Sequence, residues 1–74
     1  MFTIRVIDQN TGKPISGKKV QVLFDGFWRG STRSQYTDDD GETHFDYDNG
    51  DGKVYVGSEV VYEGYISGRK IVYI

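Results

Sequence analysis

The sequence contains no cysteine, and it has one proline and one histidine among its 74 residues. Without cysteine, the fold has no disulfide and no metal site built on thiolates. With His44 as the sole imidazole, we do not expect a zinc site made wholly of protein ligands, because such sites usually combine several histidines or cysteines. The composition therefore predicts a domain that folds on its packed core alone and holds no cofactor.

Long apolar runs and helical periodicity are also missing from the sequence. The longest apolar run is too short to cross a bilayer, and the N-terminus lacks the basic segment and apolar segment of a signal peptide. We therefore expect no membrane partner. If Met1 is the native start, the expected location is the cytoplasm; if it is not, the location stays open.

The residues that are present favour β-strands. Valine, isoleucine, tyrosine, phenylalanine and threonine dominate the ordered-looking runs, and ten glycines help to separate them. Strands are expected over residues 2–8, 18–25, 53–56, 59–63 and 69–74, and on both sides of a turn at 38–41, with further bends at 48–52 and 64–68. This spacing predicts a single all-β domain over residues 1–74, a sandwich of six to seven strands. The alternative is an SH3-like barrel, closed by the long loop at 26–33.

The net charge of −2 is unevenly distributed. Seven acidic residues and no lysine or arginine fall between residues 38 and 51, whereas several basic residues precede them. A chain with this balance has no general electrostatic attraction to a phosphate backbone. We expect no nucleic acid partner.

The clearest local signal is a tight turn at residues 38–41. The carboxylate of Asp38 can accept hydrogen bonds from backbone amides ahead of it, and Gly41 tolerates a positive φ. In the strand that follows, Phe45 and Tyr47 share one face and His44 shares the other with Asp46, because side chains alternate along a strand. The pattern predicts one apolar and one polar face.

Several short motifs, in the right order, resemble the carboxypeptidase regulatory-like domains, which share a transthyretin-like (prealbumin-like) β-sandwich. The signature positions of the first two motifs are Gly12, Pro14, Gly17, Asp38, Gly41 and Phe45. The run at 52–56 and the Gly64-Tyr65 pair are similar to two later motifs, although Thr43 and Val54 depart from the family pattern. The resemblance implies a Greek-key sandwich and a non-catalytic accessory role; it does not imply a chemistry.

The loop at 26–33 carries the predicted binding residues Phe27, Trp28, Arg29 and Arg33. Tryptophan and arginine concentrate binding energy at interfaces, and an aromatic face also suits a sugar ring. The competing interpretation is that the two aromatic residues cap a small core. We expect a non-catalytic module that binds a protein or polysaccharide through this loop. The alternative is a structural domain that self-associates into a homo-oligomer through its edge strands.

Two weaker hypotheses concern the acidic stretch and the histidine. Asp38, Asp40 and Glu42 are weak candidates for a calcium site, since calcium prefers clustered oxygens, but their spacing differs from an EF-hand and turn chemistry explains them equally well. His44 is a candidate general base for a small hydrolase, but a base also needs an orienting partner and a pocket. We therefore expect no bound metal and no enzyme activity.

Overall fold

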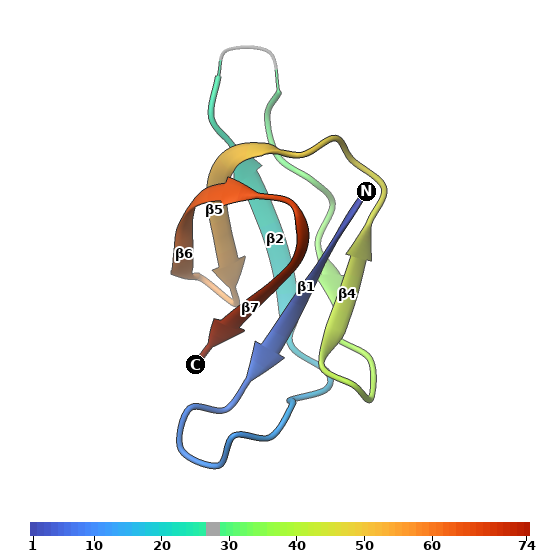
Figure 1. Ribbon diagram of the computed structural model, residues 1–74, viewed down its shortest axis with the longest axis vertical. Coiled ribbons are helices and arrows are strands. Elements are labelled where there is room, and N and C mark those ends of the chain that lie inside the picture. Colours follow the sequence, from blue (N-terminus) through green and yellow to red (C-terminus); the bar gives the residue numbers. More distant parts are fainter. Residues whose placement is uncertain (27–28) are drawn as a thin grey trace.

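The computed structural model describes residues 1–26 and 29–74, and this part of the chain forms seven β-strands in two sheets (Figure 1). The strands are β1 (Phe2–Ile7), β2 (Lys19–Phe24), β3 (Gln35–Tyr36), β4 (Glu42–Phe45), β5 (Gly50–Val56), β6 (Glu59–Ile66) and β7 (Gly68–Tyr73). Sheet A has the order β4-β1-β7 and sheet B the order β3-β2-β5-β6. The predicted all-β sandwich is confirmed. Within the described ranges, no helix is long and apolar enough to cross a membrane.

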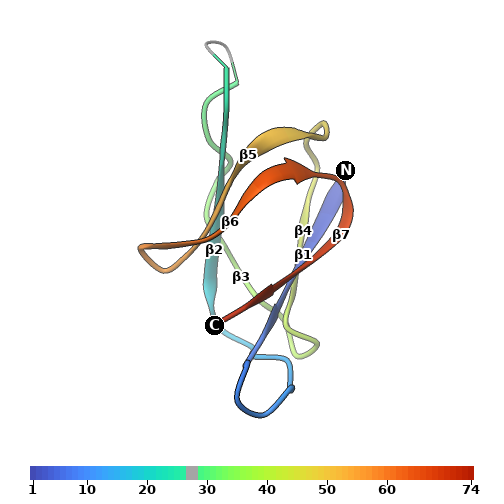
Figure 2. The same cartoon turned by 60° about the vertical axis from the view of Figure 1, so that its left-hand side comes forward.

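The two sheets face each other across a single apolar core (Figure 2). Alternate residues of each strand point inward, as the period of two requires. Phe2 and Phe45 stack at one end of the β1–β4 ladder, with ring centroids 5.4 Å apart, and both are buried. β4 ends at Phe45, two residues before the predicted strand position of Tyr47, yet Tyr47 still packs against the same core cluster.

Sheet A joins distant parts of the chain. Its central strand β1 pairs antiparallel with β4 and parallel with β7, so that the first and last strands of the domain lie side by side (Figure 1). Thr43, which departs from the family pattern, points into the core and is 2% exposed. Its hydroxyl donates a hydrogen bond to the Ile4 carbonyl at 3.3 Å, which removes the cost of burying an unpaired polar group.

The SH3-like barrel alternative is wrong, because the strands form two separate sheets of three and four strands. The chain passes from one sheet to the other between β1 and β2, β3 and β4, β4 and β5, and β6 and β7. The described residues of the loop at 26–33 do not curl sheet B closed. Its second half folds back on β2, where Phe24 N–H donates to the Gly30 carbonyl and Thr32 N–H to the Val22 carbonyl.

The two bends predicted at 48–52 and 64–68 are partly strand. β5 begins at Gly50, and β6 continues to Ile66. Gly52 lies within β5 and pairs with Phe24 of β2. A Cβ there would lie 2.5 Å from the Leu23 carbonyl oxygen, so this position needs a residue without a side chain. Gly64 lies opposite Gly52 in the ladder. These glycines mark close approach rather than chain reversal.

Candidate functional site

The predicted binding loop is partly defined by the structure. Phe27 and Trp28 lie outside the described residues. Arg29 donates to the carbonyl oxygens of Asn49 at 2.9 Å and Asp48 at 2.7 Å, and its guanidinium lies 3.9 Å from the centre of the Phe24 ring. Arg29 therefore connects the loop after β2 to residues 48–49, which precede β5. The sequence did not suggest this structural role.

Arg33 lies further along the same segment. Its side chain is exposed, and its backbone N–H donates to the Tyr47 hydroxyl at 3.4 Å. Between Arg29 and Arg33, Ser31 forms an isolated bridge with Leu23 of β2. The two arginines thus flank a short stretch that pairs with β2 on the same edge as β3.

Next to this stretch, the outer face of sheet B carries an open hollow of about 400 Å³. Its lining comes from β2, from the bridged stretch, from β5 and from the β5–β6 turn. The lining residues are Gln21, Leu23, Ser31, Tyr55, Gly57 and Ser58. None of these described residues carries a charge, and an aromatic ring, an amide and two hydroxyls face one opening. Such a mixture of apolar area and a few polar groups is typical of small-ligand sites.

The rest of that outer face is partly apolar. Leu23 is 39% exposed, Val60 48% and Tyr65 56%. In the ladder, Val60 lies opposite Tyr55 and extends the surface from the hollow to the β6 edge, whereas the Lys53–Glu63 pair separates Tyr65, which lies opposite Asp51, from the hollow. Exposed apolar side chains that adjoin one another mark interaction surfaces more often than isolated ones do.

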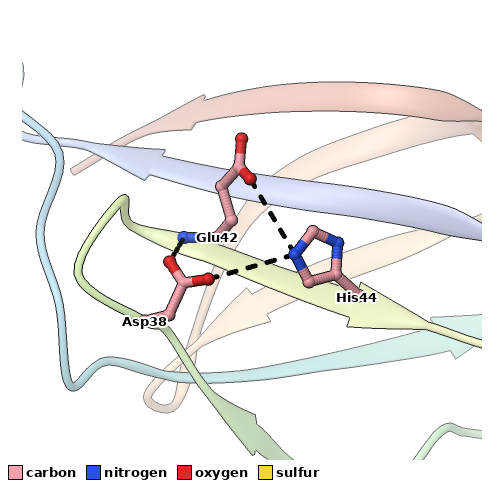
Figure 3. Close-up of side chains that lie close together, drawn as sticks. All are labelled: Asp38, Glu42 and His44. Atoms are coloured by element: carbon pink, nitrogen blue, oxygen red, sulfur yellow. Dashed lines mark hydrogen bonds and ion pairs between the residues drawn. The ribbon is translucent and has the colours of Figure 1, made fainter.

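A second cluster lies on the opposite side, on the outer face of sheet A (Figure 3). It contains Asp38, Glu42 and His44, each of which offers a metal-ligating atom within 4.8 Å of the others. The imidazole Nε2 of His44 lies 3.9 Å from a carboxylate oxygen of Asp38 and 3.8 Å from one of Glu42. Glu42 and His44 lie two residues apart on β4 and therefore share a face, while Asp38 reaches them from the preceding turn.

The turn holds Asp38 in a fixed position. Its Oδ1 accepts the backbone N–H of Asp40 at 2.9 Å and that of Glu42 at 3.0 Å. These bonds, chiefly the one from Glu42, lower the pKa of the Asp38 carboxyl from its ordinary value of 3.8. Gly41 has a φ of +74°. The predicted chemistry of this turn is confirmed in both parts.

Neighbouring strands orient the other two residues of the cluster. The hydroxyl Oγ1 of Thr3 on β1 lies 2.8 Å from His44 Nδ1. Arg69 of β7 contacts the second oxygen of Glu42, with Nη2 and Oε2 3.0 Å apart. The polar face predicted for His44 is therefore a network that crosses all three strands of sheet A.

The sequence offered three weak candidates for a calcium site, and the structure shows where each of them lies. The candidates were Asp38, Asp40 and Glu42, and the structure brings Asp38 and Glu42 together with His44 instead of Asp40. Asp40 contributes its carbonyl oxygen, which accepts a bond from Arg5 Nε at 3.2 Å. Glu42 and His44 are two residues apart on β4 and therefore point to the same side of the sheet. This spacing is the feature of the sequence from which their proximity could have been predicted.

The hollow on sheet B was not predicted, because Gln21, Ser31 and Tyr55 meet only through strand pairing. In comparisons with known proteins, no family model, no curated protein and no solved structure matches this chain. Function must therefore be argued from these two surfaces.

Proposed function

We propose that this chain is a non-catalytic binding module that holds a polymer or protein partner on the outer face of sheet B, where Ser31 of the predicted binding loop lines the hollow. The observation that carries the proposal is the uncharged hollow lined by Tyr55, Leu23 and hydroxyl and amide side chains. It lies next to the segment that the sequence singles out for binding.

The lining favours a neutral polysaccharide among the candidate partners. A tyrosine ring offers a flat face to a sugar ring, and Gln21, Ser31 and Ser58 supply donors and acceptors for its hydroxyls. The amide nitrogen of Gln21 already donates to the Thr32 carbonyl at 3.0 Å, which fixes the orientation of this side chain. A charged polymer would find no opposite charge among the described lining residues.

Affinity electrophoresis through gels that contain soluble neutral polysaccharides tests the proposal. We expect at least one glucan, xylan or mannan to retard the wild-type chain, and Tyr55→Ala to weaken that retardation about tenfold, the order of effect of losing a central aromatic contact. Tyr73→Ala is the matched control, because Tyr73 is 59% exposed but belongs to sheet A. Equal losses in both variants, or no retardation by any member of the panel, would contradict the sugar assignment.

Self-association is the second candidate function. β6 forms one edge of sheet B and is eight residues long, and long edge strands are templates for pairing with another chain. Glu59 and Glu63 on this strand, and the register shift opposite Val54 and Tyr55, oppose such pairing. Light scattering that shows only monomer over a wide concentration range would exclude this function.

We further propose that the chain is a distant carboxypeptidase regulatory-like domain with a transthyretin-like sandwich. The order of the motifs around Gly12, Pro14, Asp38 and Gly41 supports this placement. The seven-stranded, two-sheet architecture agrees with it at the level of fold class. An accessory role in such a family is compatible with a binding module and does not name the partner.

A further inference from the structure

The cluster on sheet A combines one nitrogen donor with two carboxylates. His44 and Asp38 are accessible, with side chains 58% and 50% exposed, whereas the Glu42 side chain is only 12% exposed. The imidazole Nε2 of His44 lies 3.9 Å from the Asp38 oxygen and 3.8 Å from the Glu42 oxygen, and both distances are longer than a hydrogen bond. The cluster is therefore not a hydrogen-bonded triad.

The spacing is close to that of a coordination shell. Ligand atoms bound at about 2.0–2.2 Å to a tetrahedral zinc lie about 3.4 Å from each other. The two distances to His44 Nε2, 3.9 and 3.8 Å, exceed this separation by a few tenths of an ångström, and all three ligand atoms lie within 4.8 Å of one another. Small rotations of the Asp38 and His44 side chains would shorten these distances. Both side chains have the exposure that such small rotations need, and their backbones are fixed by the turn and by β4.

The imidazole is prepared for this role by a residue outside the cluster. When Nδ1–H donates to the Thr3 hydroxyl at 2.8 Å, the Nε2 atom carries the lone pair and faces the two carboxylates. Metal-bound histidines almost always have such a partner on the other ring nitrogen. Arg69 likewise holds Glu42 Oε2 and leaves Oε1, the oxygen nearer His44, on the side of the cluster.

We propose that Asp38, Glu42 and His44 bind a divalent first-row transition metal, of which zinc is the representative, with water completing the coordination. One nitrogen and two oxygens suit zinc, whereas calcium takes six to eight oxygen ligands. The site lies on the opposite sheet from the proposed partner surface and does not depend on it. Bound metal would join the turn at Asp38 to β4.

Titration of the purified, untagged chain with zinc chloride tests this site. Because His44 is the only histidine, its two ring-proton NMR signals report on the site without ambiguity. We expect saturable binding of one zinc per chain, with shift or broadening of both signals, and no change with calcium chloride at the same concentration. His44→Gln should weaken zinc binding at least tenfold by calorimetry.

Asp46→Asn is the matched control, since it removes an exposed acid that directly follows β4 and should leave zinc affinity unchanged. Circular dichroism of each variant establishes that it is folded. The proposal is overturned if wild type shows no saturable binding, if His44→Gln binds as tightly as wild type, or if Asp46→Asn weakens binding equally, which would mark general attraction to the acidic surface.

Discussion

The outer faces of the two sheets have different chemistry although their inner faces build one core. On sheet A, Thr3, Glu42, His44 and Arg69 form a polar network across three strands. On sheet B, the outer face carries a hollow with an uncharged lining, and apolar side chains adjoin it. Core packing constrains every second residue of a strand, so the residues between are free to differ. The difference separates a candidate ion site from a candidate partner surface.

The first prediction compares the stability cost of replacing one turn glycine beside sheet A with that of replacing one turn glycine beside sheet B. Gly41, before β4, and Gly57, between β5 and β6, both have positive φ, at +74° and +64°. A Cβ at Gly41 would lie 2.7 Å from the Val6 carbonyl oxygen, whereas one at Gly57 would meet nothing within 4 Å. Gly57→Ala therefore costs the left-handed conformation alone, about 1–2 kcal/mol. Gly41→Ala adds a backbone clash, for a total of about 2–5 kcal/mol.

Urea unfolding of both variants measures this difference in the free energy of unfolding. In a domain of this size, the Gly41 variant is expected to lose most of its margin. Equal losses for the two variants would show that the turn before β4 relaxes away from β1, and the sheet A cluster would then lack the rigid support described above.

The second prediction concerns the pH dependence of the same turn. The backbone bonds from Glu42 and Asp40 lower the pKa of Asp38 in the folded state below its ordinary value of 3.8. A lowered folded-state pKa means that the carboxylate stabilises the fold above pH 3.8 and loses that contribution as the pH falls through the folded-state pKa. Asp38→Asn cannot titrate, so its stability should fall less steeply in acid than that of wild type.

Urea midpoints measured from neutral pH into acid give the two slopes. Asp39→Asn is the control, because it removes the adjacent exposed acid while Asp38 keeps its bonds, and its curve should run parallel to that of wild type. If Asp38→Asn also runs parallel to wild type, the turn is not stabilised by the charge of Asp38.

Local chemistry made this turn predictable from the sequence. The bonds to Asp38 come from residues two and four positions ahead, and Gly41 is part of the same turn. The inward positions of β1 and β2 were equally accessible to prediction, because alternation within one strand reveals them. The pattern also placed His44 on a polar face without its partners.

Those partners and the hollow depend on strand pairing, which the sequence does not state. Thr3 reaches His44 because β1 pairs with β4, and Tyr55 lies opposite Gln21 because β5 pairs with β2. The predicted strand boundaries near Gly52 and Gly64 were wrong because strand pairing is not visible in the sequence. In the sequence each glycine looks like part of a turn, and only its pairing with a neighbouring strand shows that it lies within the sheet.

The last prediction, with the smallest expected effect, compares how salt changes the stability cost of one substitution on each outer face. The Arg69–Glu42 ion pair, with a nitrogen–oxygen distance of 3.0 Å, is partly exposed, and Arg69→Met should cost about 0.2–1 kcal/mol at low ionic strength. In 1 M salt, where the screening length is about 3 Å, that cost should shrink by about half.

Val60→Thr on sheet B is the control, at a residue that is 48% exposed. This substitution changes polarity but not charge, so its stability cost, within about 0.5 kcal/mol, should be the same at both salt concentrations. Equal salt dependence in the two variants would mean that the contacts of sheet A stabilise the fold by packing of the Arg69 side chain rather than by its charge.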